Sequence, residues 1–267
     1  MVHLDNFKIY HYPDGHKHVV SDKDLQGDTS LQVRIKSFDD LFLAAQVRAI
    51  HPELTHLYIW YMLGGRCDRR FSPGEALDLK IVCDYINSMG WEYIGVTKPH
   101  SPKTLEFLQK GSYAYDPTLC LLDKVKRDLR NGRVCYVSPD AGASQWINNY
   151  DLPSIIQGSK KRDPKTGAVT GVQFIRTKID GTEIDALREK EGYDNFVIVD
   201  DLCDGGGTFI AIAKEIKMRY PNAKVYLVVT HAIFSKGFEP FEGLIDGIYC
   251  TNSFADWNNP LVKQIKL

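Results

Sequence analysis

The sequence shows no surplus of charge of either sign. Its 267 residues include 33 Lys and Arg against 34 Asp and Glu, which leaves a formal net charge of −1. Proteins that bind nucleic acid usually carry a broad basic surface that neutralises phosphates. We therefore expect no nucleic acid as the main partner, although a local basic pocket could hold a small polyanion.

Long apolar runs are also missing. The N-terminal stretch MVHLDNFKIYHYPDG contains no apolar core of signal-peptide length. No other stretch reaches the roughly 20 apolar residues that a membrane helix requires. These absences predict a soluble, cytoplasmic protein with no membrane partner.

Paired cysteines, repeats and low-complexity segments are absent as well. The six cysteines are dispersed and form no CxxC pair, so neither a zinc framework nor a disulfide framework is indicated. Most of them lie inside apolar runs, where a cysteine is usually a small buried hydrophobic residue. A hydrophobic content of 43% is that of a globular protein with a substantial core.

Short apolar runs alternate with amphipathic segments along the chain. The runs predict strands over Leu57–Leu63, Tyr93–Thr97, Arg133–Val137, Phe196–Val199, Lys224–Thr230 and Gly247–Cys250. Helices are predicted over Glu75–Met89, Leu122–Gly132 and Thr208–Arg219. Apolar strands separated by helices are typical of parallel sheets covered on both faces. We therefore predict an α/β fold with an N-terminal half over 1–130 and a C-terminal half over 131–267, each a mainly parallel sheet flanked by helices.

The strongest motif is Val197–Phe209, which reads VIVDDLCDGGGTF. An apolar strand runs into two acids, a glycine-rich turn and an amphipathic helix. Glycines let backbone amides converge on an anion, and a helix N-terminus directs its dipole toward the same point. Acids at the strand end suit vicinal hydroxyls or a hydrated Mg²⁺. The motif therefore predicts a phosphate site beside a polyol or cation site; an ordinary glycine turn with capping acids is the alternative.

A basic segment lies between the predicted strands of the C-terminal half. Ser159–Gly171 reads SKKRDPKTGAVTG and contains both Pro and Gly. This composition predicts a mobile loop.

The order of strand, Asp-Asp, Asp, glycine turn and Thr resembles the phosphoribosyl pyrophosphate motif. Type I phosphoribosyltransferases and ribose-phosphate pyrophosphokinases share that motif. The other matching segments are YPDG at 12–15, RCDRRFSPGE at 66–75, KPHS at 98–101, SPDAG at 138–142, KKR at 160–162 and TH at 230–231. They follow the order of the pyrophosphokinase family across nearly the whole chain. The chain thus resembles the ribose-phosphate pyrophosphokinases, in a compact form like that of phage-encoded relatives.

This resemblance implies two similar phosphoribosyltransferase-like halves and an ATP-dependent reaction that requires Mg²⁺. The β,γ-diphosphoryl group of ATP would pass to the anomeric hydroxyl of a ribose phosphate. The resemblance also implies a homo-oligomer built from dimers, up to a hexamer, with the ATP site shared across a subunit interface. Two alternatives stay open: a phosphoribosyltransferase that consumes phosphoribosyl pyrophosphate, and a non-catalytic regulatory homologue.

The resemblance further implies roles for individual residues. Lys160 and Arg162 would be the catalytic cations that close over the transferring phosphates. ATP would be held by Tyr12, Asp14, Arg66, Asp68, Arg69, Arg70 and His100. The ribose phosphate would be held by Asp200, Asp201, Asp204, Gly205, Gly206, Gly207, Thr208 and Phe209. His100 and Asp140 would hold Mg²⁺, directly or through water.

In the ribose-phosphate pyrophosphokinases this loop has a D-T-x-G-T-like pattern with hydroxyl residues, and the glycine turn of this chain departs from it at two positions. Gly205 stands where a first Thr is expected, and Phe209 stands near a second hydroxyl position. Glycine would open space there, and Phe209 would offer an aromatic face for stacking. These departures predict an acceptor whose 5-phosphate continues into a larger group, such as ADP-ribose, with ribose 5-phosphate as the other choice. His16, Gln145 and Trp146 also differ from the family pattern.

Overall fold

The structure is a computed structural model that describes residues 2–21, 25, 27–162, 169–177 and 182–267. It divides into two compact units, Met1–Asp116 and Pro117–Leu267. The junction falls before helix α4 (Thr118–Asp128), whose apolar residues pack into the core of the second unit. The predicted boundary near residue 130 lies on the far side of this helix, and the extent of the two functional halves stays a prediction.

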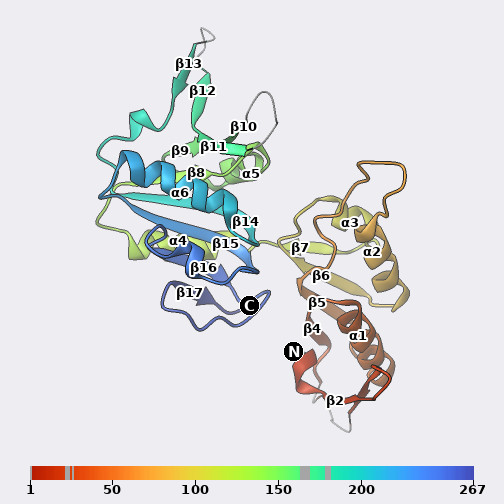
Figure 1. Cartoon of the computed structure of the whole chain (residues 1–267). Coiled ribbons are helices and arrows are strands. Elements are labelled where there is room, and N and C mark those ends of the chain that lie inside the picture. The colour runs from red at the N-terminus through yellow and green to blue at the C-terminus, as the bar shows by residue number, and fades with distance from the viewer. Residues whose placement is uncertain (1, 22–24, 26, 163–168, 178–181) are drawn as a thin grey trace. The chain divides into compact units, whose positions relative to one another are not determined.

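The first unit is built on a five-stranded parallel sheet with the order β1-β4-β5-β6-β7 (Figure 1). Its strands are β1 (Val2–His3), β4 (Ser30–Arg34), β5 (His56–Tyr61), β6 (Tyr93–Thr97) and β7 (Tyr113–Tyr115). A separate antiparallel hairpin joins β2 (Lys8–His11) to β3 (Lys17–Val20). A short 3-10 turn at Leu4–Asn6 connects β1 to the hairpin.

The helices of the first unit are α1 (Phe38–Ile50), α2 (Asp78–Ser88) and α3 (Lys103–Phe107). Neighbouring strands follow the order of the chain, so right-handed connections place their helices on one face of the sheet. The apolar residues of α1 and α2 accordingly form one core with the alternate strand residues Leu31, Val33, Leu57, Ile59, Ile94 and Val96. Among the described residues of this unit, the opposite face carries aromatic and polar side chains such as Gln32, Tyr58 and Trp60 rather than a helix.

The second unit holds a six-stranded parallel sheet with the order β17-β16-β15-β14-β8-β9. Its strands are β8 (Val134–Ser138), β9 (Ile155–Gln157), β14 (Asn195–Cys203), β15 (Lys224–Ala232), β16 (Gly247–Thr251) and β17 (Val262–Ile265). Helices α4 and α5 (Ala141–Ile147) cover one face, and α6 (Gly207–Arg219) covers the other. Short 3-10 turns lie at Asn148–Tyr150, Arg188–Lys190 and Glu239–Phe241.

Two antiparallel ribbons extend from the second sheet. One pairs β10 (Ser159–Arg162) with β11 (Val169–Gln173), and the other pairs β12 (Ile175–Thr177) with β13 (Glu183–Asp185). The prediction of a mobile loop over Ser159–Gly171 is therefore wrong at both of its described ends, where the chain forms strands. Residues 163–168 of that stretch lie outside the described residues.

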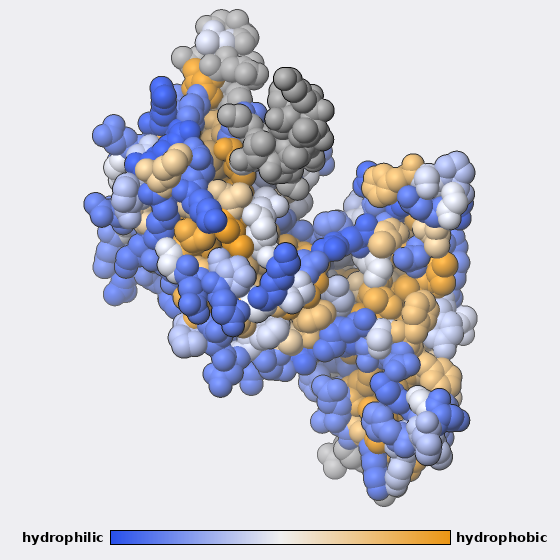
Figure 2. Space-filling model, in the orientation of Figure 1, coloured by the Kyte–Doolittle hydropathy of each residue, from blue (hydrophilic) through white to orange (hydrophobic). Residues whose placement is uncertain are grey.

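The predicted α/β fold is confirmed, and each of the six predicted strands corresponds to an observed one. The helix predicted over Leu122–Gly132 begins and ends earlier than expected, because α4 starts at Thr118 and ends at Asp128. Cys83, Cys135, Cys203 and Cys250 are buried as expected, whereas Cys67 and Cys120 are exposed. No helix within the described ranges has the length and apolar character needed to span a membrane. On the face seen in Figure 2, the second unit is mainly hydrophilic and the first unit carries more hydrophobic patches.

Candidate functional site

The acids of the main motif lie near the carboxyl end of β14, between β8 and β15. Asp200 is half-buried and Asp201 is buried. Removal from water and the negative charge of Asp201 raise the pKa of Asp200 well above its ordinary value, with a further contribution from Asp140. The structure therefore brings three predicted carboxylates into electrostatic range of one another, at the edge where parallel sheets bind ligands.

The glycine turn adopts the conformation that an anion site requires. Gly206 has a φ of +75° and is the N-cap of α6, which begins at Gly207. A Cβ at Gly206 would overlap the ring of Phe241, so both the backbone angle and the space require glycine. Since Gly206 has no side chain to cap the helix, the first-turn amides of α6 can bind an anion instead. Apart from its chain neighbours and the backbone of its own helix, no described atom lies within 4 Å of a Cβ built on Gly207, so this part of the turn is open.

Phe209 does not offer the aromatic face expected of it. Its side chain is only 5% exposed and belongs to the core beneath α6, together with Ile212 and Ile216. The spacing of these residues is that of a buried helical stripe. The predicted stacking contact at Phe209 is therefore wrong, because the ring faces the protein interior.

The predicted open space at Gly205 also needs correction. A Cβ built on Gly205 would lie 3.3 Å from both Cδ and Cε of Lys236. The side chain of Lys236, which sequence analysis did not single out, therefore occupies the space beside this glycine. Residues 31 positions apart in the sequence meet here, and no local pattern indicates such a contact.

Asp140 lies at the start of α5, directly after β8. Its Oδ1 accepts a hydrogen bond of 2.9 Å from the backbone N–H of Ala143 and so caps the helix. Its backbone carbonyl accepts a bond of 2.7 Å from Ser138 Oγ. The structure thus explains this acid locally as a helix cap, and its predicted role in binding Mg²⁺ stays a prediction.

Lys160 and Arg162 lie on β10 rather than in a loop. Their backbones pair with Val172 and Val169 of β11, and the register shifts between Lys161 and Arg162. The backbone N–H of Gly158 donates a bond of 2.8 Å to the carbonyl of Ser138, which joins the start of the ribbon to the end of β8. The ribbon that carries these two positions therefore begins beside the SPDAG segment.

In the first unit, Asp68 connects the loop after β5 to the loop after β6. Its carboxylate is buried and accepts three hydrogen bonds: one of 2.7 Å from Ser101 Oγ, one of 2.9 Å from Arg69 Nε and one of 3.1 Å from Arg69 Nη2. Its backbone carbonyl accepts a hydrogen bond of 3.1 Å from Lys103 Nζ. The Arg69 guanidinium, followed by the Ser101 hydroxyl, lowers the pKa of Asp68 to about 2. Asp68 therefore positions basic side chains rather than facing an anion itself.

A broad open hollow of about 730 Å³ lies beside this network. Its lining includes four cationic side chains, which are Arg69, Arg70, Lys80 and Lys103. Arg66 and His100, which were also predicted to bind ATP, are exposed and do not line the hollow. They lie on adjacent segments, since a Cβ on Gly65 would be 3.9 Å from the Cβ of His100. The hollow thus gathers cationic side chains from the loop after β5, from α2 and from the start of α3.

Tyr12 and Asp14 occupy the turn of the β2–β3 hairpin. Asp14 Oδ1 accepts a bond of 3.0 Å from the backbone N–H of His16 and so closes the turn. The Tyr12 ring is 50% exposed, with its centroid 5.6 Å from that of His16. An exposed ring could stack on a base, although neither residue lines the basic hollow.

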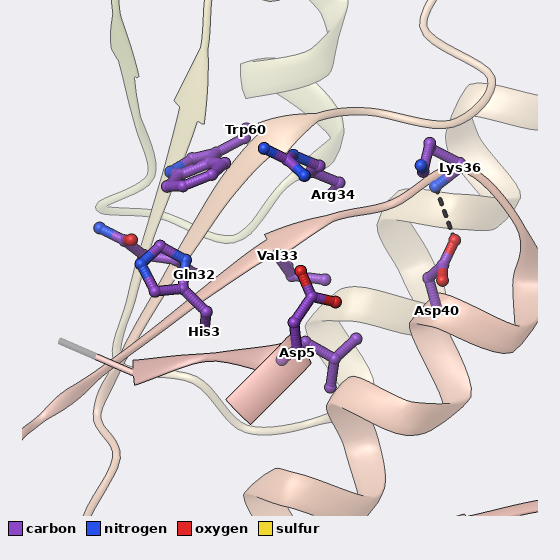
Figure 3. A pocket seen from close by; sticks show the side chains of 9 residues that line it. His3, Asp5, Gln32, Val33, Arg34, Lys36, Asp40 and Trp60 are labelled. Atoms are coloured by element: carbon purple, nitrogen blue, oxygen red, sulfur yellow. Dashed lines mark hydrogen bonds between the residues drawn. The ribbon is translucent and has the colours of Figure 1, made fainter. Parts of the chain in front are cut away.

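A second, smaller hollow of about 140 Å³ was not anticipated from the sequence. Figure 3 shows His3 and Arg34 beside Trp60, with Asp5 nearby and a hydrogen bond between Lys36 and Asp40. The Arg34 guanidinium lies 5.1 Å from the centre of the Trp60 ring, and the His3 ring meets the same ring edge-on at 4.9 Å. None of the predicted ATP or ribose residues lines this hollow.

No group of three or more His, Cys, Asp or Glu side chains suited to a metal occurs in the part of the chain that the structure describes. His100 and Asp140, the predicted metal residues, belong to different units. Magnesium commonly uses only one or two carboxylates together with substrate phosphates. The acids at the end of β14 and at the start of α5 have the hard oxygen donors that such a site requires.

No family model matches the chain. Curated relatives are found over most of its length. The ribose-phosphate pyrophosphokinase of Mycoplasmopsis pulmonis is 25% identical over 260 residues, which are 94% of this chain and 75% of the relative. That of Pyrococcus furiosus is 27% identical over 261 residues, which are 94% of this chain and 86% of the relative. The chain is a homologue of the ribose-phosphate pyrophosphokinases. This homology confirms the resemblance and the enzyme class that the ordered motifs predict.

A solved structure of a pyrophosphokinase confirms the fold. The crystal structure of phosphoribosylpyrophosphate synthetase from Mycobacterium smegmatis matches with a TM-score of 0.76 at 15% identity. The match covers 97% of this chain and 85% of the other. The α/β architecture therefore extends across both units of this pyrophosphokinase homologue.

Proposed function

We propose that the chain transfers the β,γ-diphosphoryl group of ATP to the 1-hydroxyl of a ribose 5-phosphate compound and releases AMP. The observation that carries this proposal is the end of β14. There Asp200 and Asp201 meet a glycine turn whose left-handed Gly206 opens the N-terminus of α6. Homology to ribose-phosphate pyrophosphokinases over 94% of the chain supports the reaction.

The acceptor would be held by two kinds of group. The amides from Gly205 to Phe209 would bind its 5-phosphate, because a helix N-terminus without a capping side chain presents donors and a favourable dipole. Asp200 and Asp201 would accept hydrogen bonds from the 2- and 3-hydroxyls. Asp204 and Thr208, at the edges of the turn, would complete the contacts.

The donor would be held by basic side chains of the first unit. Arg69, Arg70 and Lys103 line the hollow of about 730 Å³ and would bind polyphosphate oxygens. Asp68 would keep Arg69 in place, and Arg66 would extend the basic surface. Tyr12 would stack on adenine while Asp14 accepts its amino hydrogens.

Lys160 and Arg162 would neutralise charge on the transferring phosphates. Phosphoryl-type transfer depends on positioning and charge stabilisation more than on covalent help from the protein. Mg²⁺ would neutralise part of the polyphosphate charge. In the second unit Asp140 and Asp200 or Asp201 have the oxygen donors for it, and in the first unit His100 is the residue proposed to bind it. The crowding of acids that raises the pKa of Asp200 is the kind of donor set that a divalent cation relieves.

The acceptor is either ribose 5-phosphate or a 5-substituted form such as ADP-ribose. The burial of Phe209 removes one argument for the larger acceptor. The open space beside Gly207 gives a 5-substituent room to extend out of the turn. This space is the reason to retain the 5-substituted acceptor in the proposal. A dimer-based homo-oligomer and a cytoplasmic location remain parts of the proposal.

The test is to incubate the purified chain with ATP and Mg²⁺ and either ribose 5-phosphate or ADP-ribose, and to measure AMP by chromatography. We expect AMP together with an acceptor that carries a new 1-diphosphate by phosphorus NMR. Accumulation of ADP and a monophosphorylated sugar would contradict the proposal. A phosphoribosyltransferase would instead consume phosphoribosyl pyrophosphate, and a regulatory homologue would give no AMP with either acceptor.

Asp200→Asn and Asp201→Asn test the acceptor side of the proposal. Each should raise the KM for the acceptor and leave the KM for ATP nearly unchanged. Asp84→Asn is the control, since Asp84 is an exposed acid on α2. Unchanged acceptor KM and kcat in both variants would place the ribose elsewhere.

A further inference from the structure

The turn after β15 crosses the glycine loop of the acceptor site. A Cβ built on Gly205 would lie 3.3 Å from Cδ and from Cε of Lys236. This spacing is tighter than most contacts of a real Cβ, so the close approach depends on the missing side chain at Gly205. The Lys236 ammonium group is one bond beyond Cε and is therefore carried to the edge of the loop.

The backbone that carries Lys236 is firmly held. The N–H groups of Ile233 and Phe234 donate to the carbonyl of Cys203 at 2.9 and 3.3 Å, and the N–H of Gly237 donates to the carbonyl of Phe234 at 2.9 Å. Phe234 adopts a left-handed φ of +48° and is only 3% exposed. A bulky residue in that conformation persists only where its surroundings impose it.

Those surroundings are a cluster of aromatic rings. The Phe234 ring lies 4.8 Å from Phe238, 5.5 Å from Phe241 and 5.9 Å from Trp257, measured between centroids. Phe241 is also the ring that excludes a side chain at Gly206. One aromatic cluster therefore sets both the anion-binding turn and the turn that bears Lys236.

Lys236 differs from two lysines of this unit, Lys217 and Lys263, in its electrostatic surroundings. Lys217 and Lys263 are paired with Asp246 and Asp128 at 2.8 and 2.7 Å. Within the residues that the structure describes, the Lys236 ammonium group has no carboxylate within 4.0 Å. An exposed cation without an acid partner, held beside backbone amides that can bind an anion, is available for a phosphate.

We propose that Lys236 binds the 5-phosphate of the acceptor. The ammonium group donates hydrogen bonds to phosphate oxygens and supplies the donor that Gly205, lacking a hydroxyl, does not. The absence of a side chain at position 205 and the presence of lysine at position 236 are thus two parts of one arrangement. This inference rests on the proposed function, because it takes a phosphorylated ribose as the ligand of the turn.

The test compares Lys236→Gln and Lys236→Ala with Lys214→Gln. Lys214 is an exposed lysine of α6 outside the turn and is the matched control. Calorimetric titration measures the binding of ribose 5-phosphate, of ADP-ribose and of ribose without phosphate, in each case without ATP. Steady-state AMP release then gives the KM for acceptor and for ATP, and thermal unfolding checks the fold.

We expect both Lys236 variants to bind at least one phosphorylated acceptor about tenfold more weakly, since a charge-assisted hydrogen bond is lost. The binding of unphosphorylated ribose, the KM for ATP and the unfolding temperature should stay unchanged, as should all properties of Lys214→Gln. A loss confined to ribose 5-phosphate assigns Lys236 to a terminal phosphate. A loss for both acceptors assigns it to the phosphate that both share.

Equal affinity of wild type and Lys236→Gln for both phosphorylated acceptors would overturn the inference, even where AMP is released. Failure of wild type to bind either acceptor would overturn it too. Lys236-dependent binding without AMP release would instead contradict the proposed reaction and leave Lys236 as a phosphate-binding residue. The two proposals therefore fail by different measurements.

Gly205→Ala gives an independent check. The added methyl group would displace the Lys236 side chain from its 3.3 Å contacts, although the backbone of Gly205 tolerates alanine because its φ is not positive. We expect a loss of acceptor affinity in the same direction, and no further loss when Lys236→Gln is added. Fully additive losses would show that Gly205 and Lys236 act separately.

Discussion

The two units place their candidate binding groups at the carboxyl ends of parallel strands, but they hold those groups by different means. In the second unit the groups are largely backbone: the amides after Gly206 and two short acids on β14. In the first unit they are long basic side chains on the loop after β5 and on α2 and α3, and two of them, Arg69 and Lys103, are held by hydrogen bonds to Asp68.

The two units also differ in how many faces of the sheet are covered by helices. Helices cover both faces of the second sheet, and two separate cores lie beneath them. In the described part of the first unit, helices cover one face of the sheet and contribute to a single core. The glycine turn is therefore wedged between strand, helix and aromatic rings, whereas the loops around the basic hollow are fixed by a few polar contacts.

This difference teaches how each site should respond to substitution. A change at the turn of the second unit should disturb packing and stability together with binding. A change in the hydrogen-bonded loops of the first unit should alter binding while the sheet stays folded. The predictions below test that division, from the largest expected effect to the smallest.

Phe209→Thr should destabilise the second unit strongly. The Phe209 ring is 5% exposed in the core beneath α6, and deleting a buried phenylalanine side chain typically costs about 3–5 kcal/mol. Denaturant unfolding measures the loss. Phe71→Thr is the matched control in the first unit, since Phe71 is 83% exposed and should change stability by less than about 0.5 kcal/mol.

A stable Phe209→Thr protein with an altered preference between ribose 5-phosphate and ADP-ribose would break the contrast. It would show that the ring reaches the acceptor after all, and that side chains set specificity in both units.

Lys160→Ala and Arg162→Ala should each lower kcat by about 10²–10³, since one charge-stabilising donor is lost at the transferring phosphates. Stability should change little, because both positions lie on the short ribbon β10–β11 outside the central sheet. Lys161→Ala, at the position between them, is the control. AMP release under saturating substrates gives kcat.

These variants sharpen the contrast because they test side chains of the second unit that lie on the ribbon β10–β11, outside the glycine turn. Near wild-type turnover in both variants would remove Lys160 and Arg162 from the catalytic machinery. A loss equal to that of Lys161→Ala would point to the ribbon backbone instead.

The central strands could be predicted from the sequence because burial on both faces leaves continuous apolar runs. β6 was predicted to the residue at Tyr93–Thr97. β14 and β15 extend beyond the predicted runs to Cys203 and Ala232, because the polar residues that follow each run interrupt its apolar pattern. The edge strand β7 (Tyr113–Tyr115) was missed, since its three exposed residues carry no burial pattern. The ribbon strands were missed because β10 is a run of polar and basic residues that resembles a loop.

The candidate site divides in a similar way. The acids and glycines of the turn are contiguous in sequence, so local chemistry predicts them. The helical spacing of Phe209, Ile212 and Ile216 indicates that the ring is buried. The expectation of an exposed aromatic face came instead from the family pattern, which has a hydroxyl residue near position 209. The contact of Asp68 with Ser101 spans 33 residues, and that of Gly205 with Lys236 spans two loops. Such contacts depend on which loops the fold brings together.

Asp68→Asn should raise the KM for ATP about tenfold and destabilise the first unit by about 1–2 kcal/mol, because an amide cannot replace the charged bonds to Arg69. Hydrogen exchange of peptides from the two loops locates the loss. The second unit should be unaffected, and unchanged exchange in the first unit would show that Asp68 does not hold these loops.

The same substitution makes a prediction about pH. Because the Arg69 guanidinium lowers the pKa of Asp68 from 3.8 to about 2, the carboxylate stabilises the folded state fully above its ordinary pKa. That contribution is lost as the pH falls through about 2. The stability difference between wild type and Asp68→Asn should therefore shrink over this acidic range, and a difference independent of pH would contradict the assigned charge.

Lys80→Ala should have the smallest effect, although Lys80 lines the same hollow as Arg69 and Lys103. Its ammonium group lies 2.6 and 2.7 Å from the carboxylate oxygens of Asp84, one turn along α2. Exposed pairs of this kind contribute about 0.3–0.5 kcal/mol, and the acid already compensates the charge of Lys80. We expect a stability loss of that size and a change in the KM for ATP of less than about threefold.

Lys103→Ala is the matched comparison, because Lys103 donates to the uncharged carbonyl of Asp68 and retains its charge for a ligand. Its removal should raise the KM for ATP about tenfold at a charge-assisted contact. Equal effects of the two lysines would mean that the hollow attracts ATP by its summed charge. A larger effect of Lys103 would mean that the hydrogen bonds around Asp68 decide which basic side chains bind ATP. That result is the one expected if the first unit positions its binding groups through hydrogen-bonded side chains.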